Sequence, residues 1–276
     1  MRRPAIVVTA VLFASAPTVP AAAAAQSAPT VPAVAAAQSA PAGPVVALGA
    51  QLVPGRGVSI VESAQVVGGV LYKVRGRFAF GKGRVAASEW TETVVDAGRR
   101  RDLGRFRNVG GIEYASGGGW AKKLPEGKTW VRMDDPPSPP ERASYRPLNV
   151  FEPATLRKVL ATTAAKTPGG VVGGARTVLH KGSITTGSLY AVSPSFRELF
   201  AERPSARAAR VEVRWRLWLD TENLPRRLTT SWVLPADLED SLHGGLITDT
   251  RFSGWGSPSV IKAPPAGDRV DHADLG

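Results

Sequence analysis

The stretch of sequence that decides the fold is VEVRWRLWLDTENLPRRL, residues 211–228. Large apolar side chains occupy every second position from Val213 to Leu219, and charged residues fill the first positions between them. A period of two is that of a β-strand with one buried face. The residues DTEN at 220–223 favour a turn, because Asp and Asn side chains bond their own backbone. We therefore predict an antiparallel hairpin whose second strand covers residues 227–234.

The same period recurs from residue 71 onward, where one face of a predicted strand is apolar and the other is basic. The apolar face carries Tyr72, Val74, Phe78 and Phe80. A Gly-Lys-Gly turn at 81–83 leads into a returning strand at 84–95. We also predict a hairpin of 120–124 with 129–133, and C-terminal strands at 248–252 and 259–262. Because no long helices alternate with these strands, a parallel sheet is disfavoured.

Three helices are expected between the strands. The first begins at Pro153, a residue tolerated in the first helical turn, and continues with Leu156, Val159, Leu160 and Thr163 at helical spacing. The second begins at Pro194, where Ser195 and Glu198 have the spacing of a capping box. Its apolar face carries Phe196, Leu199 and Phe200. The third covers residues 236–242, between a proline and a glycine.

The N-terminus has the layout of a cleavable secretory signal. Two arginines follow Met1, an uncharged apolar run covers residues 5–16, and an alanine-rich stretch at 21–25 offers cleavage positions. The apolar run is shorter than the roughly 20 residues that cross a bilayer as a helix. Residues 1–25 are therefore predicted to be a signal peptide, with no permanent membrane span after cleavage.

A near-perfect tandem repeat follows the apolar run: APTVPAAAAAQS at 16–27 and APTVPAVAAAQS at 28–39. Frequent proline without large apolar side chains is typical of an extended spacer. We predict an Ala/Pro-rich disordered linker at 26–54 and a single domain at 55–276. About 220 residues suffice for one core without disulfides, and the chain has 0 Cys.

The formal net charge of +12 raises the question of a nucleic-acid partner. Arginine supplies 26 of the 35 positive charges, a bias typical of a GC-rich genome, and the charges are scattered along the chain. The one tight cluster, Arg99-Arg100-Arg101, adjoins an aspartate and is expected in a solvated loop. No nucleic-acid binding is predicted. Outside the membrane, the surplus favours peripheral contact with anionic envelope components.

Motifs for catalysis are weak throughout. The Gly-Lys-Thr at 127–129 lacks the first glycine of a phosphate-binding loop, because Lys122 stands there, and no G-x-S-x-G occurs. Asp220 and Glu222 are expected to be turn residues. A hydrolase that uses this carboxylate pair is a less favoured alternative. The histidines are expected at the surface and too far apart in sequence to bind a metal: His180, His243 and His272. We predict no catalytic residues, no cofactor and no metal.

The 7 tryptophans, several of them in predicted strands, supply large apolar faces. If the sheet curls and its helices do not fill the inner surface, the remaining space is a cavity for an apolar ligand. If the helices fill it, Trp215, Leu217, Trp232 and Phe252 form a dry core. The residue pattern alone favours the dry core.

A resemblance shifts this balance toward the cavity. Residues 211–228 and the later RFSGWGSPSVIKAPPA at 251–266 resemble the C-terminal half of the LolA-like superfamily. The similarity is to the LppX/LprG-type envelope lipoproteins of high-GC Gram-positive bacteria, in which a strand ending W-x-D, a turn reaching L-P-x-R and a strand before A-P-P recur. This chain lacks the lipobox cysteine that anchors those lipoproteins.

The resemblance implies a mainly β, α+β fold: a curved, open antiparallel half-barrel with helices covering the concave face. It implies a secreted, non-catalytic protein of the cell envelope that binds a lipid, lipopeptide or other apolar ligand as carrier, chaperone or sensor. The alternative is a secreted structural or interaction domain with a packed core. From strand alternation and the helix face, the pocket candidates are Tyr72, Val74, Phe78, Phe80, Val213, Trp215, Leu217, Trp232, Phe252, Phe196, Leu199 and Phe200.

Overall fold

The computed structural model describes residues 43–66, 69–133, 139–144, 146–200, 202–233 and 245–275. All of them belong to one compact unit, Ala40–Gly276. The predicted signal peptide, the repeat and the predicted helix at 236–242 lie outside the described residues. Residues 44–51, in the range expected to be linker, form helix α1 (Pro44–Gln51), and Leu48 and Leu52 are buried in the core.

Strands dominate the described residues. They are β1 (Arg56–Val66), β2 (Leu71–Gly81), β3 (Arg84–Asp96), β4 (Arg99–Val109), β5 (Ile112–Ser116), β6 (Trp130–Met133), β7 (Thr163–Val172), β8 (Ala175–Thr185), β9 (Glu212–Asp220), β10 (Pro225–Val233), β11 (Gly245–Pro258) and β12 (Arg269–Asp271). They form one sheet in the order β12-β6-β5-β4-β3-β2-β1-β11-β10-β9-β8-β7. The pairing is antiparallel except between β12 and β6. The predicted mainly antiparallel sheet is confirmed.

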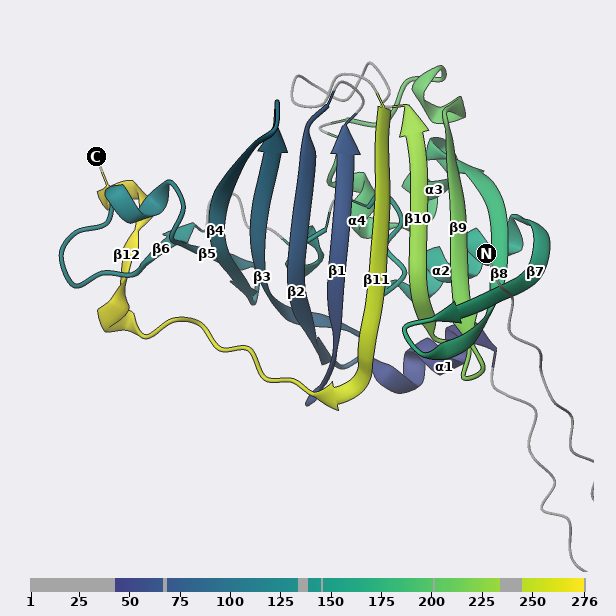
Figure 1. Ribbon diagram of the computed structural model, residues 1–276, viewed down its shortest axis with the longest axis horizontal. Helices are drawn as coiled ribbons and strands as arrows, with labels where there is room; N and C mark the ends of the chain where they lie inside the picture. The colour runs from purple at the N-terminus through teal and green to yellow at the C-terminus, as the bar shows by residue number, and fades with distance from the viewer. Residues whose placement is uncertain are drawn as a thin grey trace, which may run out of the picture. The chain divides into compact units, whose positions relative to one another are not determined.

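The sheet is built in two runs of hairpins. The first run covers β1 to β6, and the second covers β7 to β11. The two runs join where β11 pairs with β1 along almost its whole length. The connection between the runs contains α2 (Pro153–Ala161), while α3 (Thr186–Val192) and α4 (Pro194–Arg197) link β8 to β9. The sheet is curved, and α2, α3 and α4 lie on its concave side, behind the strands in Figure 1.

Both principal hairpin predictions are confirmed, and their turns have physical reasons. Gly81 pairs with Arg84, so Lys82 and Gly83 form a two-residue turn, and Gly83 takes a φ of 74° that glycine adopts without strain. Between β9 and β10, Asp220 Oδ1 accepts hydrogen bonds from the backbone N–H of Glu222 and Leu224, each at 2.9 Å. Asp220 therefore organises the turn through its own backbone, as expected from the sequence.

Two strand predictions are wrong. Residues 120–124 do not form a strand: Trp120–Lys122 is a 3₁₀ helix, and β6 pairs instead with β5 and with β12. The apolar spacing there is too short to distinguish the two structures. Residues 259–262 follow β11 without joining the sheet, because Ser259 bonds back to the carbonyl of Gly55.

Other local predictions need correction. The basic cluster at 99–101 opens β4 and is not a loop, because its backbone pairs with β3 at Asp96, Val95 and Val94. The first helix ends at Ala161, so Thr163 begins β7. The cap of α4 is Ser193, whose Oγ accepts from the N–H of Phe196 at 3.2 Å.

Short 3₁₀ helices complete the described structure. They are η1 (Trp120–Lys122), η2 (Pro140–Arg142), η3 (Ala208–Arg210), η4 (Ala266–Asp268) and η5 (His272–Asp274). In the described ranges, every helix is too short or too polar to cross a lipid bilayer.

Candidate functional site

The candidate site is the inner face of the sheet, which we define as the face turned toward α2, α3 and α4. Nearly all predicted pocket residues meet there in one apolar cluster, with Tyr72 packed against its edge. Leu199 does not: its side chain is 48% exposed, because the chain leaves α4 after Arg197 and turns it outward. The structure thus brings together residues from β2, β9, β10, β11 and α4. That they line a ligand pocket stays a prediction.

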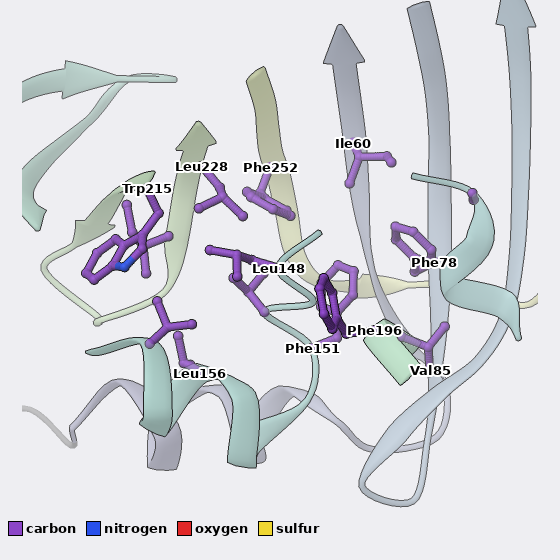
Figure 2. Packing of buried hydrophobic residues seen from close by; sticks show 14 of the residues in the cluster. Ile60, Phe78, Val85, Leu148, Phe151, Leu156, Phe196, Trp215, Leu228 and Phe252 are labelled. Atoms are coloured by element: carbon purple, nitrogen blue, oxygen red, sulfur yellow. The ribbon is translucent and has the colours of Figure 1, made fainter. Parts of the chain in front are cut away.

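Phe151 is the centre of one half of this cluster. It precedes α2, and its ring centroid lies 4.8 Å from that of Phe78, 5.9 Å from that of Phe80 and 6.0 Å from that of Phe252. Figure 2 shows Phe151 and Leu148 in the space between the strands and the helices. The sequence analysis missed both residues. The apolar Val150-Phe151 pair, one residue before the helix-opening Pro153, is the signal that could have identified Phe151.

Trp215 anchors the other half. Its indole Nε1 donates to Thr162 Oγ1 at 3.2 Å, just after α2, so the ring fixes the end of this helix to β9. The register places Gly182 of β8 directly beside Trp215. A Cβ on Gly182 would lie 2.6 Å from the Trp215 ring and 2.2 Å from the carbonyl oxygen of Thr162. Glycine is therefore required for this tryptophan to lie against β8.

A buried ion pair lies inside the apolar layer. Glu62 of β1 and Arg146 of the segment before α2 have side chains only 0% and 2% exposed, and Arg146 Nη1 lies 3.5 Å from Glu62 Oε2. The hydroxyls of Ser144 and Thr250 both donate to Glu62 Oε2, each at 2.5 Å. The carboxylate is thus well supplied with donors.

The guanidinium of Arg146 has fewer polar partners and lies among aromatic rings. Its Cζ lies 5.0 Å from the ring centroid of Phe151 and 5.8 and 5.7 Å from those of Phe78 and Phe252. Among the described residues, Nε of Arg146 has no hydrogen-bond partner, and Nη1 has only its ion pair with Glu62 at 3.5 Å, too long and misaligned for a good hydrogen bond. Burial lowers the pKa of Arg146, and the opposing attraction of Glu62 and then Glu141 does not cancel this effect. The layer thus holds a desolvated cation whose hydrogen-bonding capacity the described residues use only in part.

Further polar groups continue from this pair along the inner face. Thr250, Thr248 and Thr230 are all buried, and the hydroxyls of Thr230 and Thr248 lie 2.7 Å apart. Trp232 Nε1, on the same strand as Thr230, has no hydrogen-bond partner within the described structure. A short band of hydroxyls and donors therefore crosses an otherwise apolar surface.

Catalytic geometry is not seen at the residues the sequence offered. Asp220 is committed to its turn and to Arg226, whose Nε lies 2.5 Å from Asp220 Oδ2. His180 is buried in β8 rather than at the surface, because it shares the inner face with Leu217. His243 lies outside the described residues, and His272 packs edge-on against Trp120. In the described ranges, no group of three or more His, Asp or Glu side chains is placed to hold a metal ion.

Comparison with models of protein families finds no match, and neither does comparison with curated proteins. Among solved structures, LprF from Mycobacterium bovis is similar with a TM-score of 0.43 and 14% identity, covering 80% of this chain and 96% of that one. A porin-like protein from Bacteroides uniformis gives a TM-score of 0.26 and 6% identity, covering 71% and 95%. A LolA superfamily protein from Nitrosomonas europaea gives 0.24 and 12%, covering 80% and 93%. Since these likenesses are partial, the function of this chain has to be argued from its own residues.

Proposed function

We propose that this protein is an exported, non-catalytic binding protein that holds a lipid or other apolar ligand between the inner face of its sheet and the covering segments. The proposal rests on Arg146, a buried guanidinium that lies within an aromatic layer and whose Nε has no hydrogen-bond partner among the described residues. A buried donor without a partner costs about 1–3 kcal/mol. A ligand with an acceptor at one end and an apolar chain would satisfy both parts of this environment.

The apolar part of the site is a layer of large side chains. Phe78, Phe151 and Trp215 are each at most 2% exposed, and they belong to one continuous cluster. Burying a C16-type chain contributes on the order of 10 kcal/mol before the cost of ordering it. A chain entering this layer has to displace part of the packing that the described residues make now.

We expect the helices over the inner face, here called the cover, to move when a ligand enters. The helices α2, α3 and α4 have 9, 7 and 4 residues. Isolated helices of this length are not stable in water, so these depend on their contacts with the sheet. Glu152 ties two of them together: its Oε2 accepts from Ser193 Oγ at 2.6 Å, and its Oε1 accepts from the N–H of Ser195 at 2.9 Å. The cover is thus expected to shift as one unit.

Export and placement at the cell envelope follow from the N-terminal sequence. The signal at 1–25 directs the chain out of the cytoplasm, and the repeat that follows acts as a spacer before the domain. Because the chain has 0 Cys, a lipidated cysteine does not hold it to the membrane. The expected form is an exported protein free to carry its ligand.

A second function is favoured by one observation. Leu217, Val213 and Phe78 are each 0% exposed, so the inner face is already packed where these residues lie. A protein with a permanently closed layer would act as an exported interaction domain with no small ligand. The two functions predict different masses for the purified protein.

Native mass spectrometry of the mature protein, purified mildly from two hosts with different lipids, distinguishes them. The ligand-binding proposal predicts a mass above that of the polypeptide, which organic extraction removes. The variant Glu62→Gln/Arg146→Met removes the buried pair at similar volume and is expected to lower this occupancy. Arg216→Met, on the opposite face, is the matched control and should keep it.

Loss of the extra mass in the inner variant alone supports the proposal, provided that both variants melt cooperatively. A clean polypeptide mass from both hosts, together with no uptake of added phospholipid, contradicts it and favours the packed interaction domain.

A further inference from the structure

The face of the sheet away from the helices, the outer face, carries an unusually dense set of cations. They lie on six strands of the sheet: β4, β2, β11, β10, β9 and β8. We call this set the outer cationic band: Lys73, Arg75, Arg77, Arg100, Arg105, Arg107, Lys181, Arg214, Arg216, Arg227 and Arg251. Its position is independent of whether the inner face binds a ligand.

The strand register makes the band continuous. Arg105 lies opposite Thr91, Thr91 opposite Arg75, and Arg75 opposite Val61. Across the junction of the two runs, Val61 lies opposite Arg251, which lies opposite Arg227. Neighbouring strands are about 4.8 Å apart, so this row of side chains crosses the sheet as a line perpendicular to the strands.

Two hollows lie along this line. The first, of about 420 Å³, is lined by Lys73, Arg75, Arg100 and Arg251, together with uncharged residues and the acidic residues Glu62 and Asp249. The second, of about 720 Å³, is lined by Lys181, Arg214, Arg216 and Arg227, and it also reaches Asp249 and Glu212. Both are therefore open, predominantly cationic spaces held by β-strands.

Carboxylates neutralise only part of this charge. Asp249 is bound by Arg227 through two bonds of 2.9 and 2.6 Å. Glu89 serves three arginines at once, accepting from Arg77 at 3.0 Å, from Arg107 at 3.2 Å and from Arg105. Burial, followed by repulsion from Arg107 and Arg77, lowers the pKa of Arg105. Repulsion between guanidinium groups is thus part of the resting structure.

Several cations have no carboxylate at all. In the described ranges, no salt bridge or side-chain hydrogen bond is made by Lys73, Arg75, Arg100, Lys181, Arg214, Arg216 or Arg251. Arginine predominates, and its planar fork matches the oxygens of phosphate better than lysine does. The unpaired fraction of the band is thus suited to a partner with several phosphate groups.

The same face lacks the features that other polyanionic partners need. Its tryptophans are covered: Arg227 lies 4.8 Å above Trp218, and Arg107 lies 4.7 Å above Trp130. Nucleic-acid bases would therefore find no free aromatic ring on which to stack. Among the described residues that line the two hollows, the large apolar side chains that are exposed are Val61 and Ile247, whereas side chains that enter a membrane surface are typically Trp, Phe and Leu.

We propose that the outer cationic band binds a linear, flexible polyanion whose charges are phosphate groups and which carries no aromatic bases. Its phosphates occupy the two hollows in succession, and Asp249 between them stays paired with Arg227. This site is distinct from the inner face, so the proposed polyanion binding and the proposed binding of an apolar ligand can be tested independently.

Long-chain inorganic polyphosphate is the probe, and its binding to the mature protein is measured by calorimetry at several salt concentrations. The variant Arg214→Gln/Arg216→Gln/Arg251→Gln removes three exposed, unpaired cations of the band. The control Arg84→Gln/Arg157→Gln/Arg203→Gln removes three exposed cations elsewhere and changes the net charge equally. The band variant should bind at least about 10-fold more weakly, with a salt slope smaller by about 2, while the control changes affinity less than about 3-fold.

Equal weakening of both variants would overturn the proposal, because net charge alone would then explain binding. It would also be overturned if the protein binds oligothymidylate, or phosphatidylglycerol vesicles, more tightly than it binds polyphosphate. Unchanged melting temperatures of both triple variants confirm that the folds compared are the same.

Discussion

The two faces of β9 differ sharply in polarity and exposure. Val213, Trp215 and Leu217 are at most 2% exposed and pack against the helices, whereas Arg214 and Arg216 between them are exposed. One strand thus contributes to an apolar layer and to a cationic surface through nothing more than its period of two. The stability and any ligand binding of the inner face can therefore be changed separately from the charge of the outer face.

The largest effect is expected from Trp215→Ala. Its indole is buried and bonded to Thr162, so truncation should lower the free energy of unfolding by about 3–5 kcal/mol. Arg216→Ala, one residue along on the outer face, should change it by no more than about 0.5 kcal/mol. Urea denaturation of both variants measures the contrast. Equal losses of unfolding free energy in the two variants would contradict the difference between the two faces.

Glu62→Leu should come next, because it leaves Arg146 buried without its carboxylate. Breaking a buried pair from one side costs about 3–5 kcal/mol, less here because Arg146 is already poorly satisfied. Glu62→Leu/Arg146→Met should recover most of that loss. Chemical denaturation of the single and double variants tests this coupling. Additive losses would mean that the two side chains act independently.

Gly182→Ala tests how closely Trp215 packs against β8. The added methyl group would meet the Trp215 ring and the Thr162 carbonyl, so a loss of about 1–3 kcal/mol is expected. Gly43→Ala is the matched control, since nothing lies within 4 Å of its Cβ position. Thermal melts of the two variants provide the measurement. A neutral Gly182→Ala would show that the ring can move away from β8.

The smallest effect concerns pH. Burial, and then the charge of Lys166, lower the pKa of His180 below its ordinary value of 6.5. The unfolded chain therefore takes up a proton before the folded chain does, and the free energy of unfolding should fall as the pH drops below about 6.5. His180→Gln removes this part of the fall, whereas the same substitution at exposed His272 is the control. An unchanged pH profile for His180→Gln would contradict the burial of this ring.

The faces of β2 and β9 could be predicted from the sequence because each strand alternates over most of its length and is followed by turn-forming residues. β7 could not: it holds Pro168, Gly169 and Gly170 at the edge of the sheet, where little burial imposes a pattern. The parallel pairing of β12 with β6 was also missed, because it joins three residues to a distant strand. Tertiary contacts decide such short strands.

Most of the inner face was predictable, but its charged centre was not. Glu62 and Arg146 lie far apart in the sequence, and neither belongs to a recognisable motif. The one local signal is that Glu62 stands in the apolar phase of β1, between Ile60 and Ala64. A carboxylate in that phase predicts a buried partner without identifying it.

A crystal structure of the protein purified from its producing cells tests the central claim most directly. The account predicts electron density for an extended apolar chain beside Phe151 and Trp215, with a polar end within hydrogen-bond distance of Arg146. An inner face packed as in Figure 2, with Arg146 satisfied by ordered water and no ligand density, would contradict it.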